Sequence, residues 1–227
     1  MSFNLPNIFR RSTISHAIVF TLLLALFTHT SHSTPADPSS WRLIKEEAEI
    51  KIYTRPLPDQ PIDEIKATTR IKGSVASWLT LFEDENRAPD WLYHCLKAKT
   101  LAKGDDWITT YMETDFPWPL KDRYSIIRSE YIWDKENQGI QIVGKTHQID
   151  LQQRNHLVRV PMAKNHWQVY SLADGYIEVT VLAQVDPGGI IPKWMVNYAT
   201  ANGPYYSLLK MRRILESESF KTNENLH

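Results

Sequence analysis

The chain has 227 residues, which is the length of one ordinary domain with a short extension. It carries 26 basic and 26 acidic residues, so it lacks the basic excess of nucleic-acid-binding proteins, and no nucleic-acid partner is expected. Its single cysteine, Cys95, excludes an internal disulfide, so stability must come from a hydrophobic core.

The first 33 residues have the layout of a secretory signal peptide. Two arginines precede an apolar run over 17–27, and small residues follow up to Ser33. The run is shorter than the about 20 apolar residues that a membrane span needs, although an uncleaved single-pass anchor is the alternative. We therefore expect removal of residues 1–33, a polar linker over 34–39, and export to the periplasm or the extracellular space.

The remaining chain predicts one α+β domain over residues 40–217, followed by a polar tail over 218–227. Its first part predicts a helix over 40–48, strands over 50–53 and 65–71, a helix beginning at the N-cap residue Ser74, and a short turn or helix around 89–91. No repeat interrupts this pattern.

The second part predicts a run of strands and a terminal helix. Alternating apolar residues and turn residues indicate six consecutive strands, over 98–101, 107–116, 124–133, 139–146, 157–170 and 176–185. Such a run predicts a curved antiparallel sheet whose apolar face needs a cover. A helix over 190–217 is the candidate cover, and Gly203-Pro204 predicts a kink or break in it.

Two turn signatures flank this run of strands. The first is DFPWPLKDR over 115–123, and the second is QVDPGGIIPKW over 184–194. Together they resemble the StAR-related lipid-transfer (START) domain, which has a "PWPLxDRD" turn and a "DPGGxxPxW" junction, and the resemblance covers residues 40–217. One position departs from the pattern, because Tyr124 stands where the family has a second aspartate.

The resemblance implies a helix-grip fold: a curved antiparallel sheet wrapped around a long C-terminal helix, with an internal hydrophobic cavity. It implies binding, and by extension transfer, of a lipid or other bulky hydrophobic ligand, without catalysis, cofactor or metal. We expect a monomer that makes transient membrane contact. Two alternatives remain: an aromatase/cyclase-like enzyme with a similar cavity, and a scaffold whose own aromatic side chains fill the space.

Strand alternation nominates the cavity lining, because residues i and i+2 share a face. The resemblance implies an acid and an arginine inside the cavity on two neighbouring strands. Arg128 occupies the matching place and Glu113 a looser one, and a turn over 117–121 would bring them nearly opposite each other. A solvated ion pair is the alternative. The expected ligand-binding residues are Tyr111, Glu113, Tyr124, Ile126 and Arg128 from the strands, and Trp194, Tyr198 and Tyr205 from the terminal helix.

Overall fold

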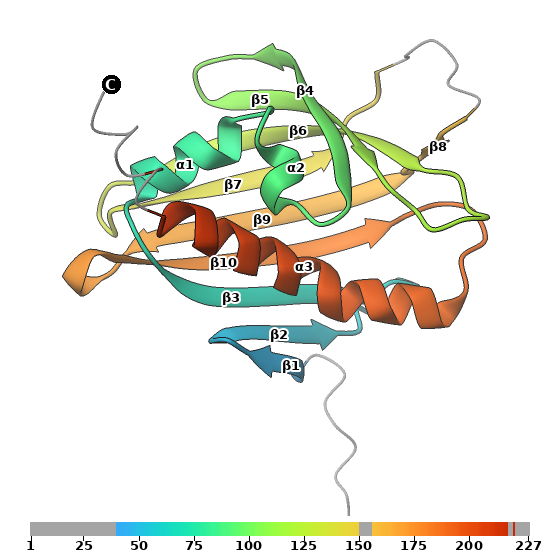
Figure 1. Ribbon diagram of the computed structural model, residues 1–227, viewed down its shortest axis with the longest axis horizontal. Helices are drawn as coiled ribbons and strands as arrows, with labels where there is room; N and C mark the ends of the chain where they lie inside the picture. Colours follow the sequence, from blue (N-terminus) through green and yellow to red (C-terminus); the bar gives the residue numbers. More distant parts are fainter. Residues whose placement is uncertain (1–39, 150–155, 218–219, 221–227) are drawn as a thin grey trace, which may run out of the picture. The chain divides into compact units, whose positions relative to one another are not determined.

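The computed structural model describes residues 40–149, 156–217 and 220 (Figure 1). The signal peptide and linker predicted over 1–39 lie outside the described residues, as does nearly all of the polar tail predicted over 218–227. Among the helices described, none is both long and apolar enough to cross a membrane.

Ten strands form one sheet in the described part of the chain. They are β1 (Arg42–Glu47), β2 (Ile50–Arg55), β3 (Glu64–Lys72), β4 (Cys95–Lys103), β5 (Trp107–Thr114), β6 (Arg123–Asp134), β7 (Gly139–Thr146), β8 (Val158–Arg159), β9 (Met162–Ser171) and β10 (Tyr176–Asp186). The strand order is β1-β2-β3-β10-β9-β7-β6-β5-β4, and every pair along it is antiparallel. The short strand β8 pairs with β6 in parallel, off this path.

Three α-helices lie on one face of the sheet (Figure 1). They are α1 (Val75–Glu83), α2 (Ala88–Trp91) and α3 (Lys193–Leu215), and a short 3-10 helix, η1 (Ala173–Gly175), joins β9 to β10. Helices α1 and α2 lie in the connection from β3 to β4. This connection crosses the sheet, because β3 is near one edge and β4 forms the opposite edge. The predicted α+β helix-grip fold is thereby confirmed.

The core lies between the sheet and the helices because the strands alternate. Alternate positions are buried on β2, at Ile50 and Ile52, and on β10, at Ile177, Val179 and Val181. These side chains meet α1 and α3 in one hydrophobic cluster. Helix α1 begins where expected, since the Ser74 hydroxyl accepts from the Ser77 amide at 3.0 Å and Ser77 Oγ accepts from the Ser74 amide at 2.9 Å. Trp78 and Leu81 on this helix are fully buried.

The helix predicted over 40–48 is wrong, because this segment is strand β1 of a hairpin with β2. Ala48 and Glu49 form the turn, and both have positive φ angles, of 49° and 58°. Two successive positive φ angles fit a type I′ hairpin turn, which usually carries Asn or Gly. Arg212 of α3 donates to the Ala48 carbonyl at 2.6 Å. A cation far away in the sequence therefore stabilises a turn that lacks the usual turn residues.

Helix α3 continues through Gly203-Pro204 without the expected break. The C-terminal half of the helix packs on the sheet, where Tyr205, Leu208 and Leu215 are buried. Residues 194–199 are mostly exposed and residues 200–204 are partly buried, so the helix has an exposed beginning and a buried end rather than one continuous aromatic face.

Candidate ligand-binding cavity

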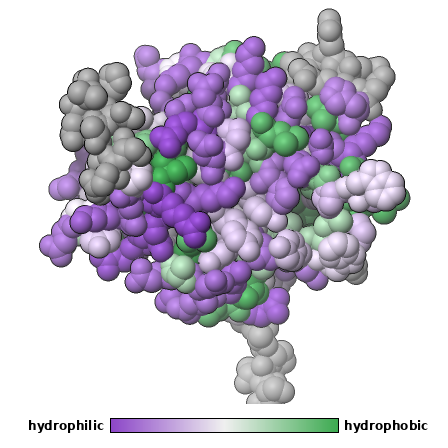
Figure 2. All heavy atoms as spheres, in the orientation of Figure 1, coloured by the Kyte–Doolittle hydropathy of each residue, from purple (hydrophilic) through white to green (hydrophobic). Residues whose placement is uncertain are grey.

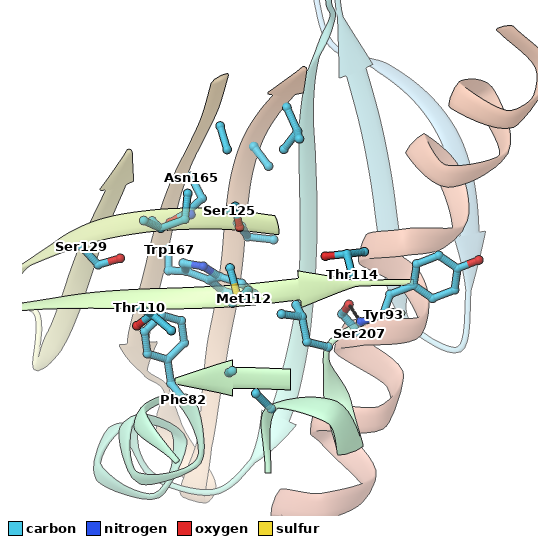
Figure 3. A pocket seen from close by; sticks show the side chains of 18 of the residues that line it. Phe82, Tyr93, Thr110, Met112, Thr114, Ser125, Ser129, Asn165, Trp167 and Ser207 are labelled. Carbon is cyan, nitrogen blue, oxygen red and sulfur yellow. Dashed lines mark hydrogen bonds between the residues drawn. The ribbon is translucent and has the colours of Figure 1, made fainter. Parts of the chain in front are cut away.

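A cavity of about 380 Å³ lies between the sheet and the helices. Its volume falls within the range of about 300–1,000 Å³ that is usual for ligand pockets. The walls come from α1, α2 and α3 on one side and from strands β3 to β6, β9 and β10 on the other. Figure 3 shows side chains from these separate elements converging on the same space.

Aromatic rings form one wall of the cavity. Phe82 of α1, Trp91 of α2 and Trp167 of β9 all line it. The Phe82 and Trp91 rings both make edge-on contact with the Trp167 ring, and their centroids lie 5.8 Å and 6.2 Å, respectively, from the Trp167 centroid. Trp78 stacks on Phe82 from the core side at 4.9 Å. These rings therefore use much of their surface on one another, and they form a fixed apolar wall.

Neutral polar side chains also line the cavity. Ser125 and Ser129 of β6 and Asn165 of β9 line the cavity, and Figure 3 shows them around Trp167. Ser207 of α3 also lines it, and its hydroxyl accepts from the Tyr93 amide at 3.0 Å. The lining is thus mainly apolar with a few polar groups, which is the usual character of a small-molecule site.

The five predicted strand residues do not line this cavity. Strands β5 and β6 line it with the opposite face, through residues such as Thr110 and Met112 on β5 and Ser125 and Ile127 on β6. The predicted residues lie on the other face of the two strands: Tyr111, Glu113, Tyr124, Ile126 and Arg128. There the Tyr111 hydroxyl donates to Glu113 at 2.7 Å, and the Tyr111 and Tyr124 rings stack.

The expected pairing of Glu113 with Arg128 is wrong. In the β5–β6 ladder Glu113 lies opposite Tyr124, and Arg128 lies opposite Thr109. The observed pairing of Thr114 with Arg123 centres the hairpin between Trp118 and Pro119, inside the expected turn, and a turn at this place puts Glu113 opposite Tyr124 and several residues away from Arg128. Arg128 instead places its guanidinium 3.8 Å from the centre of the Trp107 ring.

The three predicted residues of α3 also lie outside the cavity lining. Trp194 and Tyr198 are in the exposed beginning of the helix. Tyr205 is buried, but its ring is covered by the Lys45 ammonium at 4.0 Å. The helical residues that do reach the cavity are Gly203, Pro204, Ser207 and Leu208.

Arg123 joins the two turn signatures into one structural unit. It ends the first signature, it is almost completely buried, and its guanidinium donates to the Pro187 and Gly188 carbonyls of the second signature at 3.5 and 3.2 Å. It also donates to the Lys121 carbonyl and lies 4.0 Å from the Phe116 ring centre. Burial lowers the pKa of Arg123, and the neighbouring Asp122 carboxylate opposes this shift.

The Gly188 turn explains why the second signature needs its glycines. Gly188 has a φ of 71°, which favours glycine, and an added Cβ would approach the Arg159 carbonyl oxygen to 3.1 Å. Asp186 holds the turn, since its carboxylate accepts from the Gly188 amide at 2.9 Å. Sequence reasoning recognised both signatures but missed that one buried arginine connects them.

Reactive groups are few around the cavity. Burial raises the pKa of the Cys95 thiol, and Cys95 is not among the residues that line the cavity. Within residues 40–149, 156–217 and 220, no three His, Cys, Asp or Glu side chains come together in a group that would hold a metal ion.

A curved antiparallel sheet and a C-terminal helix enclose a mainly apolar cavity, which is the arrangement of a helix-grip fold. The chain is 28% identical to an uncharacterized protein of Pseudomonas aeruginosa, over 78% of this chain and 87% of that protein. It is 24% identical to mouse phosphatidylcholine transfer protein, over 81% of this chain and 87% of the mouse protein. No protein-family model matches the sequence.

Solved structures agree with these sequence similarities. The STAR-related lipid transfer protein from Xanthomonas axonopodis superposes with a TM-score of 0.72 and is 26% identical, covering 78% of this chain and 99% of that one. The resemblance to START domains that the two turn signatures indicate is confirmed by these similarities.

Proposed function

We propose that this protein binds a lipid or similar hydrophobic molecule in the cavity and carries it between membranes without catalysis. The observation that supports the proposal most is the mainly apolar cavity of about 380 Å³ between the sheet and the helices of a START fold. Relatives named as lipid-transfer proteins support the same conclusion. The cavity presents an aromatic wall and neutral polar groups, which suits binding of an intact ligand.

Purified protein is expected to bind one apolar molecule per chain. Native mass spectrometry should detect a co-purifying lipid-like mass, and an apolar fluorescent probe should bind with saturation at one equivalent, because there is room for one ligand in the cavity. Extraction with organic solvent should release the endogenous ligand for identification. A protein that carries no ligand and takes up neither a sterol, a fatty acid nor a phospholipid would contradict the proposal and favour the self-filled scaffold.

We further propose that one end of the molecule touches the membrane during transfer. Trp118 in the β5–β6 loop is 92% exposed, Ile190 in the β10–α3 loop is 94% exposed, and Trp194 at the start of α3 is 67% exposed. The two loops lie side by side because Arg123 hydrogen-bonds the backbone of the second. Pale and green side chains gather on the right of Figure 2, over the part of Figure 1 where these loops lie.

The cavity reaches towards the same end. Thr114 at the end of β5 and Val185 near the end of β10 both line it, and the two loops leave the sheet from these positions. Tryptophan suits the membrane–water interface because it combines a large apolar ring with a polar N–H group. The exposed side chains therefore support a surface that meets the bilayer close to the ligand.

The double substitution Trp118→Ala and Trp194→Ala should slow ligand transfer between vesicles several-fold while leaving ligand affinity in solution unchanged. Both side chains are exposed, so their loss removes interfacial contact without opening the core. Trp133→Ala is the control, because Trp133 is also exposed but lies at the opposite end of β6 from Arg123. Equal transfer rates in the double variant and the control would place membrane contact elsewhere.

We propose that the exported form acts as a monomer in the periplasm or outside the cell. Export is supported by the signal-peptide pattern of residues 1–33. The monomer is supported by the cavity, whose described lining residues all belong to one chain.

A further inference from the structure

We infer that the cavity selects an uncharged ligand that carries a hydroxyl group, and that Asn165 recognises this group. The inference rests on the proposed function and specifies its ligand. One relative is named phosphatidylcholine transfer protein, so a ligand with a charged headgroup is the competing expectation.

Unpartnered polar atoms gather around the cavity. Only four buried side-chain nitrogen or oxygen atoms lack a hydrogen-bond partner among the residues described. Two of them, Asn165 Oδ1 and Trp91 Nε1, belong to residues that line the cavity. Leaving such an atom unpaired is unfavourable, so two of them on residues of one cavity lining point to a missing partner.

The fold makes room for the Asn165 amide. Gly144 on β7 pairs directly with Asn165 on β9, and an added Cβ at Gly144 would come within 2.6 Å of Asn165 Oδ1. On its other side Gly144 pairs with Ser129, whose side chain lines the cavity. The glycine thus forms a gap in the sheet surface between two polar side chains, and the amide occupies this gap.

The chemistry of these atoms fits a hydroxyl. The Asn165 amide offers an acceptor and a donor, and Trp91 is 4% exposed and offers a donor only. A hydroxyl can donate and accept at once, so it can pair with an amide in either orientation. Trp91 contacts Trp167, which is two residues from Asn165 on the same face of β9, so Trp91 and Asn165 are both neighbours of Trp167.

A phosphate headgroup finds no suitable partner there. The charged residues that border the cavity are Glu83, Glu85 and Lys164. Glu83 pairs with Lys103 at 2.8 Å, and the Glu85 carboxylate accepts from the Thr100 amide. Lys164 is exposed to solvent. A buried phosphate would therefore face two carboxylates and no buried cation among the described lining residues, which is unfavourable in an apolar site.

The test is a competition series in which only the headgroup varies. An apolar fluorescent probe is bound first, and the competitors share one sixteen-carbon chain that ends in an alcohol, its methyl ether, a carboxylate or a phosphocholine group. In the wild type the alcohol should compete about tenfold better than the ether and the charged compounds, because only the alcohol satisfies both halves of the amide.

Asn165→Leu should remove this preference and still bind the apolar probe. Gly144→Ala should also reduce the preference, because the new methyl group displaces the amide without removing it. Gln168→Leu is the matched control: it removes the same carboxamide group from β9, but on the opposite face of the strand and outside the cavity lining, so it should leave the preference unchanged.

Two results would count against the inference in different ways. Probe binding with no advantage for the alcohol, or with an advantage for phosphocholine, would overturn the inference and leave the carrier function intact. No binding of the probe or of any competitor to the wild type would overturn the carrier function, and this inference with it.

Discussion

Ala183→Phe is expected to lower the affinity for an apolar ligand about tenfold or more, equivalent to at least about 1.4 kcal/mol of binding free energy. Ala183 lies on β10 and lines the cavity between the polar gap at Asn165 and the neighbouring strand β3. A phenyl ring at this position occupies the space that the ligand would take. Titration with the fluorescent probe measures the loss directly.

The same substitution should not destabilise the protein. A ring that fills an apolar cavity gains contacts with the lining, and cavity-filling changes commonly add about 0.5–2 kcal/mol to the free energy of unfolding. Leu182→Phe is the control, because residue 182 points to the opposite face of β10 and should leave binding unchanged. If Ala183→Phe binds the probe as tightly as the wild type, the ligand does not occupy this cavity.

Arg123→Met is expected to lower the free energy of unfolding by about 3 kcal/mol. The substitution removes the buried donor that joins the first signature to the Pro187 and Gly188 carbonyls of the second. For a domain of this size, such a change should lower the melting temperature by roughly 6–12 °C. Urea denaturation and thermal melting followed by circular dichroism measure both quantities.

Arg128→Met is the matched control, since it makes the same replacement on the same strand. The Arg128 guanidinium lies over the Trp107 ring, so its loss should cost only about 0.5–1 kcal/mol. Arg123→Lys should be intermediate, because an ammonium group cannot span two carbonyls as a guanidinium does. Equal losses for Arg123→Met and Arg128→Met would show that the junction does not depend on the buried cation.

Sequence alone predicted the sheet, the capped helix α1 and the START resemblance, because each has a strong local signal. It could not choose the face of β5 and β6 that meets the cavity. Tyr111 and Ile126 are buried on one face, and Ile108 and Ile127 are buried on the other, so both faces are apolar. A period of two indicates that residues alternate, and it does not indicate which set faces inward.

Other features depended on contacts between distant segments. The turn at Ala48 and Glu49 lacks the usual turn residues and is supported by Arg212 from the last helix. Asn165 is one polar residue in a strand, and its importance appears only once Gly144 is seen opposite it. The role of Arg123 was open to prediction in part, because it stands in a signature, but its partners lie in the other signature.

The pairing of β3 with β10 has a consequence for the synthesis of the chain. Thr68 on β3 lies opposite Thr180 on β10, and their hydroxyls are 3.0 Å apart. The edge of β3 that pairs with β10 therefore stays open until residues 73–175 have been synthesised. Until then β3 has one unpaired edge, and long-range pairing of this kind is slow. An open strand edge can pair with other chains and cause aggregation. We therefore expect chaperones to protect this edge while the chain is being synthesised.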